Sequence, residues 1–414
     1  MNLTEAEKIC EKYHQKQLLF FYEQLTDRQK ESLLSQIEQL DFQLLDALKR
    51  EEKSSQKGHI TPIPVMEVAK INEKREEFLS VGTTFIKQNK IGAVLLAGGQ
   101  GTRLGLDKPK GMLNVGVNKE MYLFEILISN IMEVVKLAET FIPLYIMTSE
   151  KNHYDTVSFF EEMDYFGYPR EYIRFFTQEM APSVDYQGNI FLEDKDLISL
   201  SPNGNGGWFS SMMKSGALAD AKERGVEWLN VFSVDNVLQR IADPVFIGAT
   251  ISSGMASASK VIRKVSPEER VGVMCLEDGK PSIVEYYELS DEMRYAVNEE
   301  GTLEYGFGVI LNYLFRIADL EAICNQCIPV HIVEKKIPYM NEQGEFIKPQ
   351  ETNGYKFETL ILDLIHLLDS CLAYEVVREK EFAPIKNATG VDSLESAREL
   401  LTKNGVDIYG RKME

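Results

Sequence analysis

One segment organises the rest of this chain: Ile91-Gly92-Ala93-Val94-Leu95-Leu96-Ala97-Gly98-Gly99-Gln100-Gly101-Thr102-Arg103-Leu104-Gly105, followed closely by Lys108-Pro109-Lys110-Gly111. Its first half is a continuous apolar run of strand length, and its second half is a glycine-dense loop that carries an Arg and then a Lys. Glycines let the backbone approach a ligand closely, so successive N–H groups can converge on phosphate oxygens while the cationic side chains close over them. The segment therefore predicts a phosphate-binding loop at the end of a strand.

The composition is that of a globular protein with a substantial core. The chain has 414 residues, 44% of them hydrophobic, which is enough for one large α/β unit with appendages or for two to three domains. A net charge of −19 argues against a generally basic surface for nucleic acid or an anionic membrane. If the ligand is a polyphosphate, the Lys and Arg side chains that bind it must be concentrated at the site.

Cysteine usage and the N-terminal residues favour a cytoplasmic protein. The five cysteines are sparse and odd in number, Met1-Asn2-Leu3-Thr4-Glu5 contains no apolar run of the signal type, and no later segment has the apolar length of a membrane span. Cys324-x-x-Cys327 has a spacing found in redox and zinc sites. No second pair or suitably spaced His completes a metal site, and the surrounding sequence predicts the end of a helix, so we expect no function there.

Three parts follow one another along the chain. Residues 1–67 form a helical segment with a linker, in which Thr4 with Glu7 and Thr26 with Gln29 fit capping boxes. The helices either pack on the main domain or offer a surface to a partner. The main domain spans 68–387, and 388–414 is a short C-terminal segment with one helix from Ser393 through Lys403.

Within the main domain, strand and helix patterns alternate. This alternation is typical of an α/β fold with a mostly parallel, helix-covered sheet. The strand candidates lie near 91–97, 142–147, 228–234, 256–262 and 270–275.

The glycine loop does not match the two common nucleotide-binding fingerprints. A dinucleotide-binding turn needs G-x-G-x-x-G, but the residue three after Gly101 is Leu104, and the next Gly comes only at 105. The P-loop string G-x-x-x-x-G-K-[ST] is also absent. What remains is Gly98-Gly99-x-Gly101-Thr102-Arg103-Leu104 followed by Lys110, with more glycines and cations than a tight strand-to-helix turn requires.

A carboxylate follows the apolar strand candidate at 228–234. In open α/β sheets ligands gather at the carboxyl ends of strands, where a carboxylate commonly holds Mg²⁺ that bridges to substrate phosphates. We therefore expect Asp235 to be a metal ligand; the alternative is that it caps the next helix.

The segment Asn203-Gly204-Asn205-Gly206-Gly207 packs glycines and amides together. Its backbone could lie flat against a planar ligand while the amide groups hydrogen-bond to the ligand's edge, which suits a uracil. The alternative is an ordinary loop. The five histidines form no catalytic constellation with Ser, Cys or Asp, so we expect them to be structural or exposed.

From about 70 to about 390, the sequence resembles the UTP-dependent sugar-1-phosphate uridylyltransferases, most closely the eukaryotic-type UDP-N-acetylhexosamine pyrophosphorylases. Besides Leu96 to Gly111, the resemblance rests on Gln178-Glu179-Met180-Ala181-Pro182, Pro202-Asn203-Gly204-Asn205-Gly206-Gly207, Val234-Asp235-Asn236, Ala242-Asp243-Pro244, Val271-Gly272-Val273, Val284-Glu285-Tyr286, Lys335-Lys336-Ile337-Pro338-Tyr339, Asn353-Gly354-x-Lys356 and Arg378-Glu379-x-Glu381-Phe382-x-Pro384-x-Lys386-Asn387-Ala388.

The resemblance implies a doubly wound, Rossmann-like mixed sheet of the nucleotide-diphospho-sugar transferase type. It implies an enzyme that makes a UDP-sugar and pyrophosphate from UTP and a sugar 1-phosphate, with Mg²⁺, and N-acetylglucosamine 1-phosphate as the leading substrate. It assigns catalysis to Arg103, Lys110 and Lys386, the nucleotide to Leu96, Gly98, Gly99, Gly101, Thr102, Gln178, Gly204 and Asn205, the sugar to Gly272, Glu285, Val309, Leu360 and Leu362, and the metal to Asp235. Glu285 could equally be a solvent-facing strand residue.

The sequence departs from this family around the sugar. The N-acetylhexosamine enzymes carry an Asn in the stretch that aligns with Tyr305-Gly306-Phe307-Gly308-Val309, and two aromatic positions of the family are Leu360 and Leu362 here. Because such swaps change discrimination in an apolar pocket, glucose or galactose 1-phosphate stays open as the substrate. Two further hypotheses are a non-catalytic nucleotide-sugar sensor and an NAD-dependent oxidoreductase, and the oligomeric state stays open between monomer and homodimer.

Overall fold

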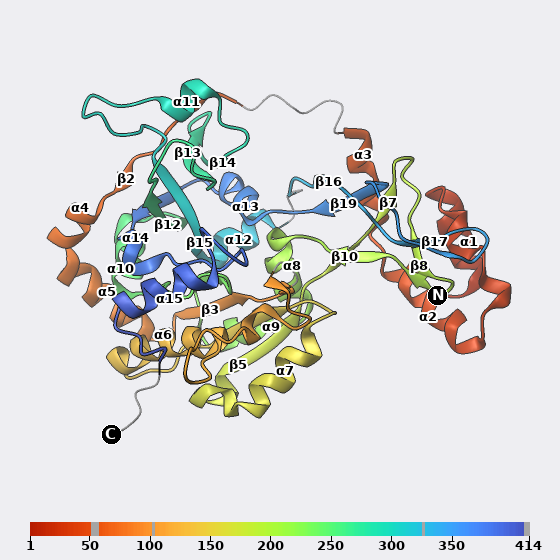
Figure 1. Ribbon diagram of the computed structural model, residues 1–414, viewed down its shortest axis with the longest axis horizontal. Coiled ribbons are helices and arrows are strands. Elements are labelled where there is room, and N and C mark those ends of the chain that lie inside the picture. The colour runs from red at the N-terminus through yellow and green to blue at the C-terminus, as the bar shows by residue number, and fades with distance from the viewer. Residues whose placement is uncertain (51–57, 102–103, 325–327, 410–414) are drawn as a thin grey trace. The chain divides into compact units, whose positions relative to one another are not determined.

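The computed structural model describes residues 1–50, 58–101, 104–324 and 328–409 of the chain (Figure 1). These residues divide into two compact units, each built from three stretches of sequence. Unit 1 contains residues 1–50, 179–207 and 328–361, and unit 2 contains 58–178, 208–324 and 362–409. The boundaries at 67/68 and 387/388 that the sequence suggests stay a prediction.

Unit 2 is built on a large sheet that has eleven strands within the described residues. Its main path runs in the order β2-β20-β12-β15-β11-β3-β4-β5, and β13 joins β15 while pairing with β1 and β14. The strands are β1 (Ile60–Pro62), β2 (Val65–Met66), β3 (Ile91–Leu96), β4 (Leu144–Thr148), β5 (Ile173–Thr177), β11 (Trp228–Ser233), β12 (Ser257–Arg263), β13 (Val273–Glu277), β14 (Lys280–Val284), β15 (Phe307–Arg316) and β20 (Cys371–Glu375).

The main path of this sheet is parallel except at one strand. β11, β3, β4 and β5 are mutually parallel, β12, β20 and β2 are mutually parallel, and β15 runs antiparallel between β11 and β12. The predicted mixed, mostly parallel α/β sheet is confirmed.

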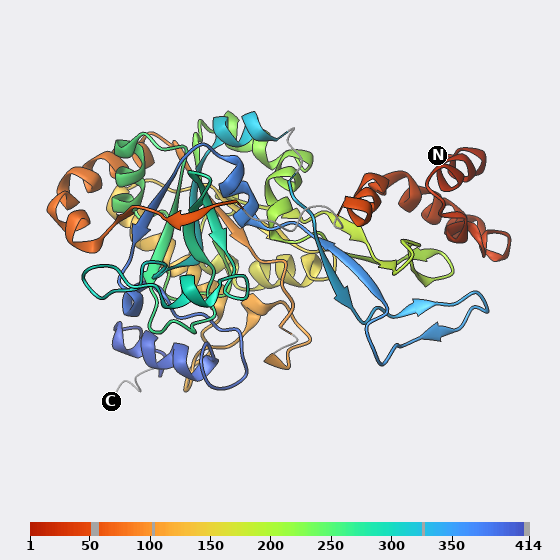
Figure 2. The same cartoon turned by 90° about the horizontal axis from the view of Figure 1, so that it is seen from above.

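Helices connect these strands and cover both faces of the sheet (Figures 1 and 2). They are α4 (Val68–Glu73), α5 (Arg75–Lys87), α6 (Leu123–Ala138), α7 (His153–Glu162), α8 (Trp208–Lys214), α9 (Ala217–Glu223), α10 (Pro244–Ser253), α11 (Asp291–Tyr295), α12 (Ile317–Ile323), α13 (Ile361–Leu367), α14 (Arg378–Glu381) and α15 (Leu394–Lys403).

The continuous apolar run of β3 is explained by burial on both faces. Ala93 and Leu95 belong to the core cluster that includes residues of α5, α6 and α10. Gly92 faces the other way, because a Cβ built there would lie 3.1 Å from the side chain of Leu229. The strand therefore lies at the centre of the unit, and its carboxyl end is a fixed place from which to build a site.

Close packing of two helices requires glycine at two positions. A Cβ at Gly82 of α5 would lie 1.9 Å from the carbonyl oxygen of Pro244, and a Cβ at Gly248 of α10 would lie 1.8 Å from that of Phe78. The backbones of α5 and α10 therefore touch, which holds the residues after β11 against the helices that precede β3.

Unit 1 combines the N-terminal helices with small sheets from two later segments. Its core packs Leu18, Leu33 and Ile37 against Val184 and Phe357. The elements are α1 (Leu3–Lys12), α2 (Asp27–Gln39), α3 (Asp46–Arg50), β6 (Met180–Pro182), β7 (Val184–Asp185), β8 (Leu192–Asp194), β9 (Leu197–Ile198), β10 (Leu200–Pro202), β16 (His331–Lys335), β17 (Tyr339–Met340), β18 (Phe346–Ile347) and β19 (Gly354–Glu358).

The helix starts were predicted with mixed success. Thr26 and Gln29 form the expected capping box of α2. The first helix begins earlier than predicted, because Asn2 and Glu5 form the box in place of Thr4 and Glu7. An Asn is as good an N-cap as a Thr, and the sequence pattern could not choose between two boxes displaced by two residues.

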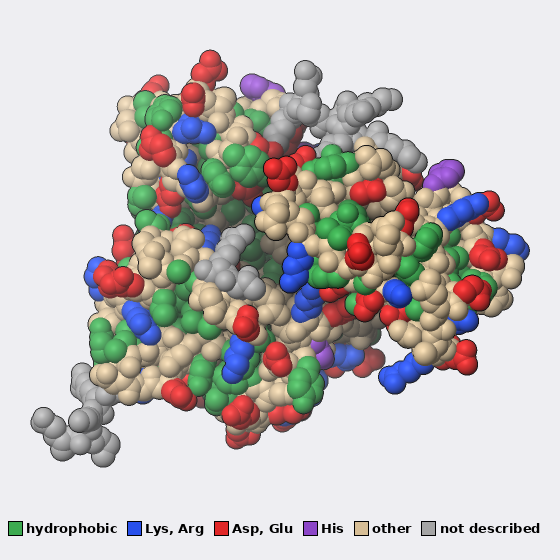
Figure 3. Space-filling model, turned by 45° about the vertical axis from the view of Figure 1, so that its right-hand side comes forward, with side chains coloured by type: hydrophobic (Ala, Val, Ile, Leu, Met, Phe, Trp, Pro, Cys, Tyr) green, Lys and Arg blue, Asp and Glu red, His purple; other side chains and the backbone are tan. Residues whose placement is uncertain are grey.

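Two general properties of the described residues are their surface charge and the length of their helices. On the face shown in Figure 3, Lys and Arg side chains lie singly or in small groups among acidic ones. Among the described residues, no helix combines the length and the apolar character needed to span a membrane.

Candidate active site

The strand order places a switch point between β3 and β11. From β3 the chain adds β4 and then β5 on one side, whereas β11 pairs with β3 on its other side, parallel to it. Ligands of open α/β sheets bind outside the carboxyl ends of strands at such a point. Two of the predicted segments follow these two strand ends: the glycine loop after Leu96 and the segment that contains Asp235.

A buried asparagine supports the first residues of the loop. The Asn152 side chain, fully buried, donates hydrogen bonds to the carbonyl oxygens of Ala97 (2.9 Å) and Gly99 (3.4 Å). Its own amide oxygen accepts one from the N–H of Ser149 (2.7 Å). These bonds hold the backbone of Ala97 and Gly99 at the end of the sheet in the free chain. The sequence analysis missed Asn152, and only its position after β4 could have suggested it.

The surroundings of the glycine differ at three positions of the loop. A Cβ at Gly98 would lie 2.8 Å from Oε1 of Gln178, and one at Gly101 would lie 2.7 Å from Cβ of Leu106. At Gly99, in contrast, no atom of the described residues lies within 4 Å of a Cβ, and its φ is not positive. Neither packing among the described residues nor backbone strain therefore requires a glycine at 99, as expected if a ligand approaches the backbone closely there.

Lys110 and Asp235 meet at the switch point. Nζ of Lys110 lies 2.5 Å from Oδ1 of Asp235, and the two side chains are 11% and 33% exposed. The partly open carboxylate can still be reached from solvent. The predicted catalytic cation and the predicted metal ligand are thus neighbours, although they are far apart in the sequence.

Lys386 belongs to a segment that runs beside Asp235. The N–H of Ile385 donates to the carbonyl oxygen of Asp235 (2.9 Å), and the side chain of Asn236 bonds to the backbone of both Glu381 (2.7 Å) and Ala383 (2.9 Å). Lys386 itself is exposed. The backbone pairing brings the residue next to Lys386 against Asp235, as the predicted grouping of these cations requires.

A buried amide network supports the segment that contains Asp235. Asn230 and Asn312, both fully buried, join through a 2.9 Å hydrogen bond, and Nδ2 of Asn312 donates to Oε1 of Gln239 (3.3 Å). Gln239 in turn donates to the carbonyl oxygen of Ser233 (2.6 Å). The sequence analysis missed this network, although an Asn inside an otherwise apolar strand was a signal of a buried polar partner.

Three predicted sugar residues lie together in unit 2. A Cβ at Gly272 would lie 3.5 Å from Cγ2 of Val309 and 3.7 Å from Oε2 of Glu285, and the N–H of Val309 donates to the carbonyl oxygen of Gly272 (2.9 Å). Glu285 follows the end of β14 and is half-buried. Leu362, also in unit 2, lies in α13 and is half-buried.

The predicted uridine loop belongs to unit 1, where it packs against its own chain. A Cβ at Gly204, whose φ is +83°, would lie 2.2 Å from the carbonyl oxygen of Thr359, and one at Gly206 would lie 2.7 Å from the backbone of Leu360. Oδ1 of Asn205 accepts a hydrogen bond from the N–H of Ile361 (2.9 Å). Contact with residues 359–361 thus accounts for these two glycines, and the assignment of the loop to uridine stays a prediction.

Two residues assigned from the sequence, Thr102 and Arg103, lie outside the described residues. So does Cys327, while Cys324 is exposed at the C-terminal end of α12, where the sequence predicts a helix end. Within the described residues no three His, Cys, Asp or Glu side chains group as a metal cluster. Mg²⁺ does not need one, since it is usually held by one or two carboxylates together with substrate phosphates and water, so the single carboxylate of Asp235 fits.

Comparison with known proteins identifies the family. The sequence pattern of the family described as "UTP–glucose-1-phosphate uridylyltransferase" matches residues 37–409. The chain belongs to this family. Relatives that match this uridylyltransferase chain include the UDP-N-acetylglucosamine pyrophosphorylase of Saccharomyces cerevisiae, 35% identical over 433 positions that cover 97% of this chain and 90% of the yeast protein.

Two further proteins with similar names also match this chain. The UDP-N-acetylhexosamine pyrophosphorylase-like protein 1 of Mus musculus is 36% identical over 404 positions, covering 91% of this chain and 79% of the mouse protein. The crystal structure of the UDP-N-acetylglucosamine pyrophosphorylase of Trypanosoma brucei in complex with an inhibitor superposes with a TM-score of 0.82 at 27% identity, covering 96% of this chain and 83% of that one. The doubly wound fold of the uridylyltransferases is therefore confirmed for this chain.

Proposed function

We propose that this protein transfers the uridylyl group of UTP to a sugar 1-phosphate, with N-acetylglucosamine 1-phosphate as the leading substrate. Membership of the uridylyltransferase family and the names of the yeast, mouse and trypanosomal relatives support the proposal. The structural observation that carries it is the meeting of Lys110 and Asp235 beside the glycine loop, at the switch point of the sheet.

The reaction is an in-line displacement. A phosphate oxygen of the sugar 1-phosphate attacks the α-phosphorus of UTP, a new P–O bond forms, and the bond to the β-phosphate breaks to release pyrophosphate. The second pKa of a phosphate monoester is near 6, so the nucleophile is largely ionised at pH 7 and needs no general base. This accounts for a site without a catalytic histidine.

The residues of the chain supply binding and charge. N–H groups of the loop at Gly98 and Gly99 bind phosphate oxygens, while Gly101, whose N–H donates to the carbonyl oxygen of Lys108 (3.2 Å), keeps the loop close to the nucleotide. Lys110 and Lys386, with Arg103, stabilise the charge that accumulates on the α-phosphate and the leaving pyrophosphate. In the free chain Asp235 neutralises Lys110. With Mg²⁺ held by Asp235, Lys110 would be available to the substrate phosphates.

Asp235 is the residue proposed to hold Mg²⁺. When bound, the ion would neutralise and orient the phosphates of UTP. The buried amides of Asn230, Asn312 and Gln239 keep the backbone around Asp235 in place, so the carboxylate is positioned whether or not the ion is present.

The remaining assignments concern uridine and sugar. We assign Gln178, Gly204 and Asn205, together with Leu96 and Thr102, to nucleotide binding, and Gly272, Glu285, Val309, Leu360 and Leu362 to the sugar. The carboxylate of Glu285 suits hydrogen bonds from sugar hydroxyl groups.

Free cysteines fit a reducing compartment and hence the cytoplasm. Among the described residues Cys10, Cys275 and Cys371 are buried thiols, and none is paired in a disulfide.

A substrate panel tests the proposal. Pyrophosphate release is measured with UTP, Mg²⁺ and each of N-acetylglucosamine, glucose and galactose 1-phosphate. We expect turnover with at least one of them and the highest kcat/KM with N-acetylglucosamine 1-phosphate. If glucose 1-phosphate gave the highest kcat/KM, the proposed reaction would stand, but N-acetylglucosamine 1-phosphate would be overturned as the leading substrate. Binding of UDP-N-acetylglucosamine without turnover in either direction would favour a nucleotide-sugar sensor and would overturn the proposal that the protein is an enzyme.

A further inference from the structure

Lys260, on β12 of the large sheet, is a lysine whose side chain is 0% exposed. Lysine is almost never fully buried unless its charge is paired, because an unpaired charge in the interior is costly. The catalytic proposal leaves this residue without a role. Its partners show what it does in the fold.

The ammonium group of Lys260 contacts two segments of the chain. Nζ lies 2.5 Å from Oε2 of Glu381 and donates to the carbonyl oxygen of Arg240 (3.0 Å). Oδ2 of Asp243 lies 3.8 Å from the same nitrogen. An ammonium group has three donors, so these oxygens account for the whole group.

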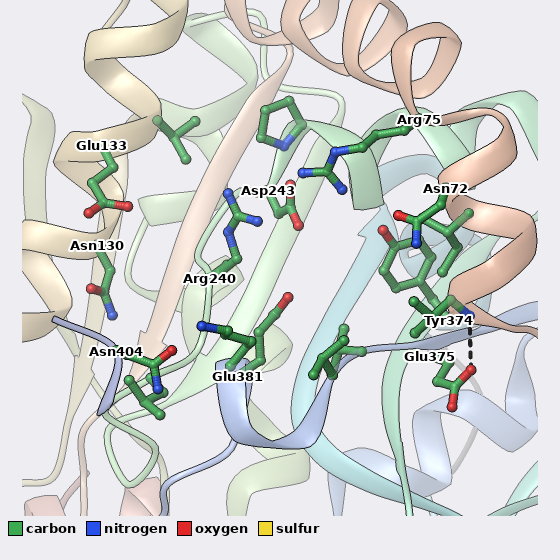
Figure 4. Close-up of a pocket in the computed structure, with 18 of the residues that line it drawn as sticks. Asn72, Arg75, Asn130, Glu133, Arg240, Asp243, Tyr374, Glu375, Glu381 and Asn404 are labelled. Carbon is green, nitrogen blue, oxygen red and sulfur yellow. Dashed lines mark hydrogen bonds between the residues drawn. The ribbon is translucent and has the colours of Figure 1, made fainter. Parts of the chain in front are cut away.

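The charges around Lys260 are balanced. Figure 4 shows Arg240 beside Asp243 and Glu381 in the wall of one cavity. The carboxylate of Asp243 raises the pKa of Arg240 above its ordinary value. The two buried carboxylates therefore face two cations, Lys260 and Arg240, and the cluster is neutral without a bound ion.

Both contacts of Lys260 lie on segments that carry proposed site residues. Arg240 lies five residues after Asp235, and Glu381 lies five residues before Lys386. A single side chain on the sheet thus contacts the segment of the proposed metal ligand and the segment of a proposed catalytic cation.

Residues 381–387 depend on this contact for their connection to the sheet. Their N–H groups bond to residues 235–236, to residues 377–378 and to Asp392, none of which lies in a strand. Among the hydrogen bonds described for 381–387, the one that comes from a strand is donated by Lys260. The other bonds join loop segments to one another, whereas this one joins them to β12.

The neighbouring strand β15 is irregular opposite Lys260. The register between β12 and β15 shifts there, and Leu311 has a φ of +53°. A β-bulge re-aims side chains, and a positive φ at a residue other than glycine costs free energy. The next residue, Asn312, donates to the same carbonyl oxygen of Arg240 (3.4 Å). Two strands therefore hold this carbonyl group, and one of them is strained.

We propose that Lys260 is a positioning residue for the uridylyl transfer: it holds Lys386 in place relative to Asp235 by joining both of their segments to β12. Because it is fully buried, Lys260 acts through Glu381 and not on the substrate. A displacement of about 1 Å at a reacting centre can lower a rate about a hundredfold. The effect on the rate rests on the proposed function, whereas the effect on the backbone of residues 382–387 does not.

Two substitutions of Glu381 separate position from charge. Glu381→Gln keeps the length of the side chain and an acceptor for Lys260, whereas Glu381→Asp keeps the charge and shortens the side chain by one methylene group. The measurement is kcat and the KM for UTP, well below the melting temperature of each variant.

We expect Glu381→Gln to keep kcat within about threefold and Glu381→Asp to lower it about tenfold or more. The KM for UTP should stay within about threefold in both, because the glycine loop does not take part in the contact. A pair that acts only through its charge predicts the opposite order. A kcat of Glu381→Asp equal to or above that of Glu381→Gln would therefore overturn the proposal.

The double variant K260M/E381M removes the contact and leaves neither of its two charges unpaired, while Asp243 keeps Arg240 beside it. We expect it to unfold cooperatively, like the wild type, and to lose kcat about thirtyfold or more. A wild-type kcat in the folded variant would overturn the proposal. If this variant did not fold, the two substitutions of Glu381 would decide alone.

Leu320→Ala is the control for a general loss of stability. Leu320 is fully buried in α12, which follows the end of β15 that pairs with the start of β11, away from the carboxyl ends of the parallel strands. The variant should melt at a lower temperature and keep its kcat. A loss of kcat equal to that of K260M/E381M would overturn the positioning role, because stability alone would then account for both.

Hydrogen exchange of the backbone amides of residues 382–387 gives a readout that needs no turnover. We expect exchange about tenfold faster in Glu381→Asp and K260M/E381M, and exchange as in the wild type in Glu381→Gln and Leu320→Ala. Unchanged exchange in the first two variants would overturn the positioning role even if their rates fell. A wild type that turned over no sugar 1-phosphate but showed this exchange pattern would overturn the proposed function and leave the contact's role in holding these residues standing.

Discussion

The phosphate end and the sugar end of the proposed site differ in how they are built. At the phosphate end, side chains that are fully buried, such as Asn152 and Asn230, hold the backbone of the glycine loop and of the segment that contains Asp235. At the sugar end, Glu285 follows the hairpin of β13 and β14, and Val309 lies on β15. Both side chains are half-buried. The geometry of the phosphate end therefore depends on the backbone, whereas the geometry of the sugar end depends on the side chains that the strands carry.

This difference indicates which end of the site tolerates amino-acid substitutions. A backbone held by buried hydrogen bonds tolerates few substitutions, because each one would leave a buried polar group without its partner. A half-buried side chain can be exchanged at small cost in stability. We therefore expect the reaction to depend on the phosphate end and the choice of sugar to depend on the sugar end.

The largest expected effect is at the phosphate end. Neutralising the carboxylate in Asp235→Asn, or the cation in Lys110→Met, should lower kcat/KM about 10³-fold, because each removes a charge that acts on the transferring phosphoryl group. The measurement is pyrophosphate release at saturating Mg²⁺.

The double variant K110M/D235N separates catalysis from a merely structural ion pair. If the pair only stabilises the fold, the double variant should regain most of the activity lost in the single ones, since no unpaired charge remains. We expect it to regain thermal stability and to stay inactive. Recovery of the rate would contradict the assigned roles.

The second effect is at the sugar end. Glu285→Gln should raise the KM for the sugar 1-phosphate about tenfold to a hundredfold, since hydrogen bonds to a charged group are worth about 1.5–3 kcal/mol, and should leave the KM for UTP unchanged. Glu292→Gln, which removes a carboxylate from the nearby but exposed helix α11, is the matched control. Equal changes in both KM values would show that Glu285 does not act on the sugar.

Glycine positions give a third, smaller effect at the phosphate end. Gly99→Ala adds a methyl group to a place where the described residues leave at least 4 Å, so the variant should be as stable as the wild type. Its affinity for UTP should nevertheless fall about tenfold, because the methyl group would stand where a phosphate approaches.

Gly98→Ala is the comparison for this effect. Its methyl group would meet Oε1 of Gln178 at 2.8 Å, so it should lower the melting temperature as well as the affinity. Unchanged UTP affinity in Gly99→Ala would mean that the loop does not contact the nucleotide there.

The sequence predicted where the segments of the phosphate end lie, because the signals that place them are local. The apolar run of β3, the glycines that follow it and the carboxylate after β11 can each be recognised within a few residues, and the ends of parallel strands lie at the same edge of the sheet. The supports of these residues could not be predicted in the same way. Asn152 and Asn312 meet their partners only after the strands have paired, and no periodicity marks a buried amide. The two compact units are likewise composed of distant segments.

The smallest effect concerns the choice of sugar and is measured as a ratio. Val309 lies beside Gly272, in the stretch where the resemblance to the N-acetylhexosamine enzymes implies an Asn. Val309→Asn adds an amide that can hydrogen-bond an N-acetyl group, so kcat/KM for N-acetylglucosamine 1-phosphate relative to glucose 1-phosphate should rise about fivefold. Val309→Leu, similar in size but without an amide, should leave that ratio near the wild-type value or lower it. Because a ratio of two substrates cancels any general loss of folded enzyme, the comparison isolates recognition of the sugar. If both variants shifted the ratio equally, side-chain size would account for the preference, and the half-buried residues of the sugar end would then select their substrate by shape alone.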